Sequence, residues 1–567
     1  MVDPQEKLQA DRELLASARR KGRLATLGAY TRLSGPGWLQ SAITLGGGSL
    51  SSSLYLGVLA GFSLLWLQPL AMILGIVMLS SIGYVAMSTK ERPFDAINRH
   101  VNPVLGWGWA LASLLANMVW ALPQYSLATA VLQQNLAPVA LGGEESRYII
   151  VGAILVVTTA ITWSYDAGGW GVKLYELLLK LMVALIVVCF VGVVIQLSFE
   201  ASLPWPDIFS GFVPDFTAIF QPAETFQPLL AAVESEANRE YWSGLIVGQQ
   251  RDVLISAAAT AVGINMTFLF PYSLLRRGWG KEFRGVAVFD LSTGMFIPFL
   301  LATSCVVIAS ASRFHTQLPE GLPGVVYEKV TAEPVEPDPG LVDRFQTMLE
   351  ARAKRDLGET ELEGAALDAE VARRADALPQ AEKRLAATLV KRDARHLAHS
   401  LRPLTGGTVA DVVFGVGVLG MALSTITLLM LISGFVICEI FKLPPRGWHH
   451  RFACLAAATG VVGPFIWGSE QADFWLAIPT SVFGFVLLPI AYLTFFLLMN
   501  QRKLLGDAMP RGVRRLGWNL AMAVAAGLAT VGSVYMCWVK ARWFGLGAVP
   551  TFLVLVGVAH FARRSRS

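Results

Sequence analysis

Three consecutive glycines, Gly46, Gly47 and Gly48, lie in the middle of an apolar stretch near the start of the chain, and Ser49 follows them. Glycine in a helix costs about 1 kcal/mol relative to alanine, so this run is expected to unwind its helix. Unwound backbone exposes N–H and C=O groups that can hydrogen-bond a solute. Within a membrane, such backbone is tolerated only where it is buried in protein or lines a cavity.

A second interruption is predicted in a later apolar stretch, over residues 263–273. Pro271 has no backbone N–H, and its ring clashes with the preceding helical turn. Paired interrupted helices are the best sequence indication of a transporter binding site, although glycine runs also serve close helix packing. The residues predicted to bind a substrate are Gly46, Gly47, Gly48, Ser49, Gln124, Thr267, Phe270, Tyr272 and Ser273.

These groups offer hydrogen bonds and aromatic surface but no charge. The chain has seven histidines and five cysteines, and none has the spacing of a metal site. No nucleophile–base pair and no phosphate-binding loop accompanies the glycines. We therefore expect no enzyme activity, no cofactor and no bound metal ligated by these side chains.

The elements that would position these residues are membrane-spanning helices. The chain has 567 residues, 54% of them hydrophobic and 15% charged, with a mean hydropathy of +0.52. Soluble domains carry about 25% charged residues, and roughly 20 apolar residues span a bilayer as a helix. We predict an all-α integral membrane protein with about 12 transmembrane helices. The predicted spans lie near 37–60, 62–87, 104–138, 148–166, 173–198, 254–275, 286–312, 408–441, 450–468, 473–499, 516–539 and 543–562.

Basic residues alternate between the loops and so indicate the orientation. Residues 1–34, the loops near Arg92, Arg276 and Arg511, and the C-terminus are basic, whereas the other loops hold few basic residues. Lys and Arg mark the cytoplasmic side. We therefore predict a multi-pass cell-membrane protein with both termini in the cytoplasm. No short apolar region precedes the basic N-terminus, so no cleavable signal peptide is expected.

One charged segment interrupts the membrane pattern. We divide the chain into a basic N-terminus (1–34), helices 1–7 (35–312), an insertion (313–405), helices 8–10 (406–500), and helices 11–12 with a basic C-terminus (501–567). The insertion is predicted to be helical and non-cytoplasmic. It either caps the outer mouth of the bundle or binds a partner or ligand.

Several motifs together resemble the natural resistance-associated macrophage protein (NRAMP) family of divalent-metal transporters. They are Gly35-Pro36-Gly37-Trp38-Leu39, Glu176 within 175–190, Gly211-Phe212-Val213-Pro214, Phe289-Asp290 and Ser424-Thr425-Ile426-Thr427. The resemblance implies the leucine-transporter fold. This fold has two inverted five-helix repeats, here 35–198 and from about 254, and two extra helices would follow. The resemblance also implies alternating access around broken helices 1 and 6.

The departures from the family bear on the substrate. The family's Asp-Pro-Gly-Asn motif aligns with Gly46 to Ser49, and its Met-Pro-His-Asn motif aligns with Phe270 to Ser273. The family's third span carries acids, whereas residues 121–125 here carry none. A bare divalent cation needs compensating charge and suitable ligands. We therefore expect an altered substrate, and proton coupling on the family's pattern is not expected.

The remaining ionisable groups are interpreted as structural. Glu176 and Lys180 are four residues apart and are expected to pair on one helix face. Asp290 is expected at the membrane interface near a span end, and Glu439 is expected to meet Lys442 or solvent at the cytoplasmic end of the eighth span.

The functional alternatives are a carrier of a neutral or zwitterionic organic solute, a carrier of a largely hydrated cation, and a non-transporting membrane sensor. The expected partners are a small solute or ion and the lipid bilayer, with no nucleic acid. The oligomeric state stays open.

Overall fold

The chain forms a helical bundle in the computed structural model. The structure describes residues 4–166, 169–200, 203–327, 338–358, 362–392, 396, 407–466 and 477–564. Within these ranges every regular element is helical. Helices are expected because a helix satisfies its own backbone hydrogen bonds inside lipid.

Nine helical segments are long and apolar enough to cross a membrane, and a bent pair of helices brings the total to ten among the described residues. They are α3 (Pro36–Thr44) with α4 (Gly47–Ala60), α5 (Leu67–Thr89), α7 (Pro103–Val131), α9 (Ser146–Asp166), α10 (Gly169–Glu200), α13 (Glu236–Ala261) with α14 (Ile264–Arg276), α15 (Arg284–Asp290) with η5 (Leu291–Phe296) and α16 (Ile297–Phe314), α21 (Gly407–Ile440), α25 (Ala477–Met499) and the first part of α27 (Gly512–Arg564).

Two of the predicted spans are shorter or less regular than expected. The stretch predicted at 450–468 is divided into α22 (Trp448–Cys454), a 3₁₀ segment and α23 (Gly463–Ile466). The last predicted span corresponds to the short apolar helix Val549–Ala562. It follows a kink in α27 at Arg542, where φ is 49°. The short separation between the last two predicted spans is therefore a sharp bend.

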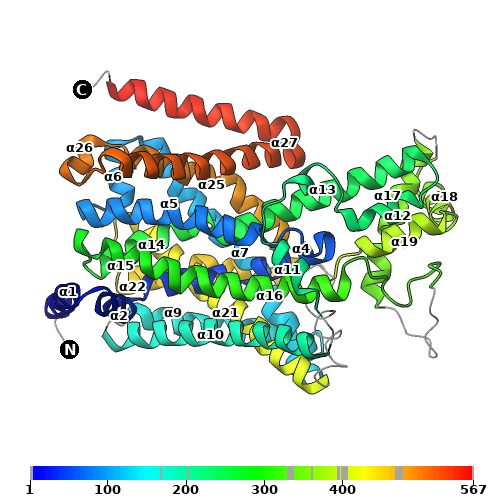
Figure 1. The fold of residues 1–567 in the computed structure, drawn as a ribbon, viewed down its shortest axis with the longest axis horizontal. Helices are drawn as coiled ribbons and strands as arrows, with labels where there is room; N and C mark the ends of the chain where they lie inside the picture. The colour runs from blue at the N-terminus through cyan, green and yellow to red at the C-terminus, as the bar shows by residue number, and fades with distance from the viewer. Residues whose placement is uncertain are drawn as a thin grey trace.

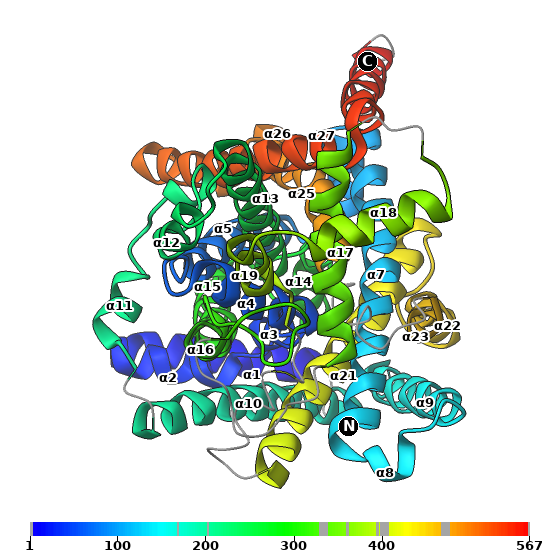
Figure 2. The same cartoon turned by 90° about the vertical axis from the view of Figure 1, so that its right-hand side faces the viewer.

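The bundle has two distinct ends (Figure 1). Both termini lie at one end, called the basic end here, with the N-terminal helices α1 (Pro4–Lys21) and α2 (Arg23–Leu33). The other end, called the insertion end, carries α17 (Pro339–Leu357), α18 (Ala365–Asp376) and α19 (Gln380–Leu389). Figure 2 looks at the insertion end, with α17 and α19 in front of the bundle.

The insertion is fastened to a spanning helix through the buried carboxylate of Glu382. Glu382 of α19 and Arg352 of α17 are almost fully buried, and their side chains are 2.8 Å apart. The Glu382 carboxylate also accepts hydrogen bonds from Trp242 Nε1 at 2.8 Å and Asn238 Nδ2 at 2.9 Å, both on α13. Helix α13 therefore extends beyond the bundle as the stem on which the insertion packs.

Candidate functional site

The first spanning helix is broken at its glycines. Helices α3 and α4 meet at an angle of 55°. Gly46 has φ −111° and ψ −178°, which is extended rather than helical backbone. A Cβ atom on Gly46 would lie 2.4 Å from Thr425 Oγ1 of α21, so only glycine allows this close approach. The predicted unwinding therefore occurs, and a neighbouring helix packs directly against it.

The second break lies elsewhere in the predicted segment. Helix α13 ends at Ala261 and α14 begins at Ile264, with Val262 and Gly263 in extended conformations between them. The prediction that Pro271 breaks the helix is wrong, because Pro271 lies inside α14. Spanning helices tolerate proline where neighbouring groups compensate for the missing hydrogen bond.

An enclosed cavity lies between the first break and four other helices. Its volume is about 10 Å³, which leaves room for about one water molecule. Its polar lining consists of backbone, hydroxyl and amide groups. The lining residues are Ile43, Thr44, Gly46, Gly48, Ser49, Trp120, Gln124, Thr260, Thr425, Thr480 and Ser481.

Hydrogen bonds to the unwound backbone organise this cavity. The Gly47 N–H donates to Gln124 Oε1 of α7 at 3.0 Å, and Ser49 Oγ donates to the Gly46 carbonyl at 2.8 Å. The buried Thr425 Oγ1 has no hydrogen-bond partner among the residues that the structure describes. A buried hydroxyl without a partner is costly, so this oxygen is available to a water molecule or solute.

Four of the predicted site residues lie along α14 and do not line the cavity. Thr267 accepts a hydrogen bond from Trp109 Nε1 at 2.8 Å. Phe270 is fully buried and packs close to Gly83 of α5. Tyr272 stacks on the Phe268 ring at 4.7 Å. Ser273 Oγ bonds the Phe270 carbonyl within the same helix at 2.6 Å.

The second break brings a thioether close to the first. Met266 Sδ lies 3.4 Å from Gly263 N and 3.6 Å from Thr44 Oγ1 of α3. Asn265 Oδ1 accepts from the Met266 N–H at 2.9 Å and so helps to satisfy the backbone donors in the first turn of α14. Sequence reasoning missed Met266 as a site residue; the signals that identify this break are Gly263 and Asn265, not Pro271.

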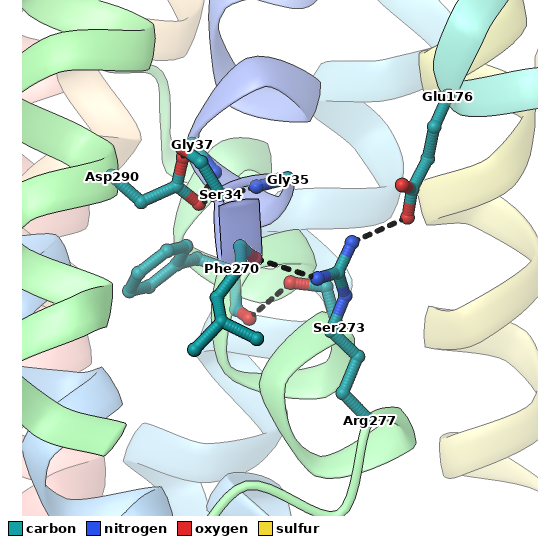
Figure 3. Close-up of polar contacts among 9 residues, drawn as sticks. Ser34, Gly35, Gly37, Glu176, Phe270, Ser273, Arg277 and Asp290 are labelled. Carbon is teal, nitrogen blue, oxygen red and sulfur yellow. Dashed lines mark hydrogen bonds and ion pairs between the residues drawn. The ribbon is translucent and has the colours of Figure 1, made fainter. Parts of the chain in front are cut away.

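The buried carboxylates hold the start of α3 rather than the cavity (Figure 3). Asp290 Oδ2 accepts from the Gly37 N–H at 2.6 Å and the Gly35 N–H at 3.0 Å. Asp290 is fully buried within the protein. Glu176 pairs with Arg277 at 2.6 Å, not with Lys180 as predicted.

A further buried carboxylate, Glu439, also lies away from the breaks. Glu439 is 5% exposed and pairs with Arg92 at 3.4 Å. Among the described residues no carboxylate lines the cavity, and no group of three or more His, Cys, Asp or Glu side chains is placed to hold a metal ion.

The sequence and the fold were compared with known proteins. The family described as natural resistance-associated macrophage protein-like matches residues 37–325 and 375–535. The chain belongs to this family. It is accordingly a multi-pass membrane transporter rather than an enzyme, at the level that family membership defines. No curated protein matches the sequence.

Solved structures share the NRAMP fold with this chain. A histidine-to-alanine variant of the Eremococcus coleocola manganese transporter has a TM-score of 0.61 at 12% identity, covering 95% of this chain and 96% of that one. The same transporter in complex with an aromatic bis-isothiourea compound has a TM-score of 0.62 at 13% identity, covering 96% of each chain. The leucine-transporter fold, expected from the sequence, is confirmed.

The second break changes the comparison with the NRAMP motifs. The sequence alignment placed Phe270 at the position of the family's methionine ligand, but Phe270 packs against α5, away from the break. Met266 is the thioether beside the break. The first-span alignment still falls at the break, because Gly46 has extended backbone there and Gly47 to Ser49 form the first turn of α4.

Proposed function

We propose that this chain is a secondary transporter that moves its solute by alternating access around the two interrupted helices, and that its central site accepts a cation that keeps its hydration shell. One observation carries this proposal. The cavity at the α3–α4 break is lined by backbone, hydroxyl and amide groups, and no carboxylate of the described chain reaches it.

The cation class follows from the family, and the hydration shell follows from the chemistry of the lining. NRAMP-like proteins carry divalent metal ions, and the neighbouring structure is named a manganese transporter. A dehydrated divalent ion needs negative ligands, whereas a hydrated ion presents water hydrogens that neutral oxygens can accept. Mg²⁺ gives up its waters reluctantly and is the natural probe for this mode of binding.

The described conformation corresponds to a closed state in this proposal. The cavity has room for about one water molecule, so a hydrated ion requires the site to widen. The start of α3 is the element proposed to move. It is held by a few polar contacts, namely Asp290 to the Gly35 and Gly37 amides and Arg277 to the Leu33 carbonyl at 3.0 Å. Breaking these contacts would release α3 from α14 and α15.

A zwitterionic organic solute is the second candidate, and the helix termini favour it. Helices α3 and α13 end at the two breaks, and α4 and α14 begin there. Helix C-termini attract cationic groups and helix N-termini attract anionic groups. An ammonium and a carboxylate of one small molecule would therefore both find a partner without a charged side chain.

Flux into proteoliposomes tests the proposal. Purified protein is reconstituted, and uptake of Mg²⁺, Mn²⁺ and a mixture of labelled amino acids is measured under the same gradient. We expect Mg²⁺ uptake well above Mn²⁺ uptake at micromolar concentrations. Amino-acid uptake alone would support the second candidate. Saturable binding without any flux would indicate the sensor and reject transport.

A further inference from the structure

The N-terminal helices lie flat across the basic end of the bundle. Helices α1 and α2 run across the spanning helices rather than along them, as the two views show (Figures 1 and 2). Gly22 joins them at φ 111°, a left-handed conformation that favours glycine. Leu15 of α1 is buried at 2% exposure, which anchors the pair to the protein. The α1–α2 corner, defined as residues 19–27, is therefore held in a fixed place.

This corner carries positive charge that the protein does not neutralise. Arg19 donates to the backbone carbonyl of Glu282 at 2.8 Å. Arg20, Lys21 and Arg23 are exposed and form no ion pair or hydrogen bond in the described part of the chain. The sequence between Glu13 and Glu91 contains no acidic residue at all. The corner is therefore complementary to an anion.

Apolar side chains are exposed beside these cations. Leu24 is 86% exposed and Leu27 is 46% exposed, and their spacing of three residues places them on one face of α2. A shallow, open depression of the surface lies at this place, lined by Arg19, Gly22, Arg23, Thr26 and Leu27. Exposed leucines directly beside unpaired cations place an apolar and a positively charged surface side by side, which complements the acyl chains and the headgroup of an anionic lipid.

We propose that the α1–α2 corner binds the headgroup of an anionic phospholipid. The phosphate would lie among Arg19, Arg20, Lys21 and Arg23, and Leu24 and Leu27 would enter the boundary of the acyl chains. The leucines favour a lipid over a soluble phosphate, which would gain nothing from them. The predicted cytoplasmic orientation of this end places the corner against a leaflet that attracts basic segments.

The corner is connected to the start of α3, so lipid binding would affect transport. Helix α2 ends at Leu33, whose carbonyl accepts from Arg277, and α3 begins three residues later. Arg12 of α1 pairs with Glu282 at 2.7 Å beside the start of α15. A headgroup that fixes the corner would therefore also restrain the element proposed to move during transport.

Lipid binding to the full chain tests this inference. Purified protein in a neutral detergent is titrated with phosphatidylglycerol or phosphatidylcholine, and bound lipid is counted by native mass spectrometry. The test variant is Arg20→Gln/Lys21→Gln/Arg23→Gln. Each basic residue near an anionic lipid contributes roughly fivefold in affinity, so we expect a loss on the order of 100-fold for phosphatidylglycerol. Phosphatidylcholine binding should be weak and unchanged.

The matched control removes three exposed basic residues from the same end of the bundle, in Arg502→Gln/Lys503→Gln/Arg511→Gln. Equal losses in the two triple variants would overturn the proposal, because the effect would then be general surface charge. The variant Leu24→Gln/Leu27→Gln identifies the ligand source. It should weaken phosphatidylglycerol binding several-fold. If glycerophosphate binds wild type as tightly as the lipid and this variant changes nothing, the site takes a soluble anion and the lipid proposal is rejected.

Discussion

Replacing Gly47 with leucine tests whether the first break is the transport site. A Cβ atom on Gly47 would lie 2.6 Å from Leu127 Cδ2 and 3.1 Å from Gln124 Oε1. Carbon atoms pack at about 3.5–4.0 Å, so Leu127 must move by about 1 Å. Such overpacking costs about 1–3 kcal/mol. Losing the hydrogen bond from the Gly47 N–H to Gln124 adds about 1 kcal/mol.

The leucine also offsets part of this loss, because glycine costs a helix about 1 kcal/mol relative to better helix formers. The net destabilisation is therefore about 1–3 kcal/mol, and we expect Gly47→Leu to fold while its uptake in proteoliposomes falls to background. Its side chain is far larger than the water-sized cavity beside it. The solute in this uptake assay is Mg²⁺, or whichever of the tested solutes the wild-type protein transports.

The control is Gly192→Leu on α10, where an added Cβ meets no atom within 4 Å and the position is exposed. This variant should keep wild-type uptake. Thermal unfolding in detergent confirms that both variants are folded. Wild-type flux in a folded Gly47→Leu protein would remove the first break from the transport path and refute the reasoning.

Three further changes probe the surroundings of the site. Gln124→Leu leaves the buried Gly47 N–H without its acceptor and should lower the free energy of unfolding by about 1–3 kcal/mol, measured by chemical denaturation; an unchanged value would contradict the assigned bond. Glu382→Gln removes the charge that Arg352 pairs with and should increase hydrogen exchange in α17, α19 and the outer end of α13 but not in the other spanning helices; equal changes everywhere would refute a local role. Burial lowers the pKa of His315, at the insertion end, below its ordinary value of 6.5. The neutral imidazole therefore stabilises the folded state above pH 6.5, and this contribution is lost as the pH falls through the pKa of His315 in the folded protein. The difference in melting temperature between wild type and His315→Gln should therefore narrow below pH 6.5. A difference that stays constant with pH would show that protonation of His315 does not affect stability.

The first break was predictable because its cause is local. Three glycines in a row destabilise any helix, and the backbone departs from helical geometry at Gly46. The second break was predicted in the right span but at the wrong residue. Pro271 is the stronger helix breaker in isolation, yet it lies inside α14, while the chain leaves helical geometry at Val262 and Gly263. Packing against neighbouring helices therefore determines at which of these two places the helix breaks.

The remaining lining of the cavity was not predictable from patterns. Thr260, Thr425 and Ser481 are ordinary hydroxyl residues within apolar stretches, and only the packing of their helices brings them to Gly46 and Gly48. The prediction of which charged residues form an ion pair was wrong for the same reason.

The spacing of Glu176 and Lys180 along one helix suggested a local pair. A long-range partner, Arg277, is 2.6 Å from Glu176 instead. Contacts between distant helices override the four-residue rule, which contributes only about 0.3–0.5 kcal/mol.

Titration of the purified protein with Mn²⁺ by isothermal calorimetry tests the central claim most directly. A site lined by neutral oxygens should bind Mn²⁺ no more tightly than about millimolar, because no carboxylate compensates the charge of the ion. Micromolar binding that is lost in Met266→Leu would show that the thioether beside the two breaks, together with neutral groups, is sufficient to hold a dehydrated transition-metal ion. That result would contradict the account.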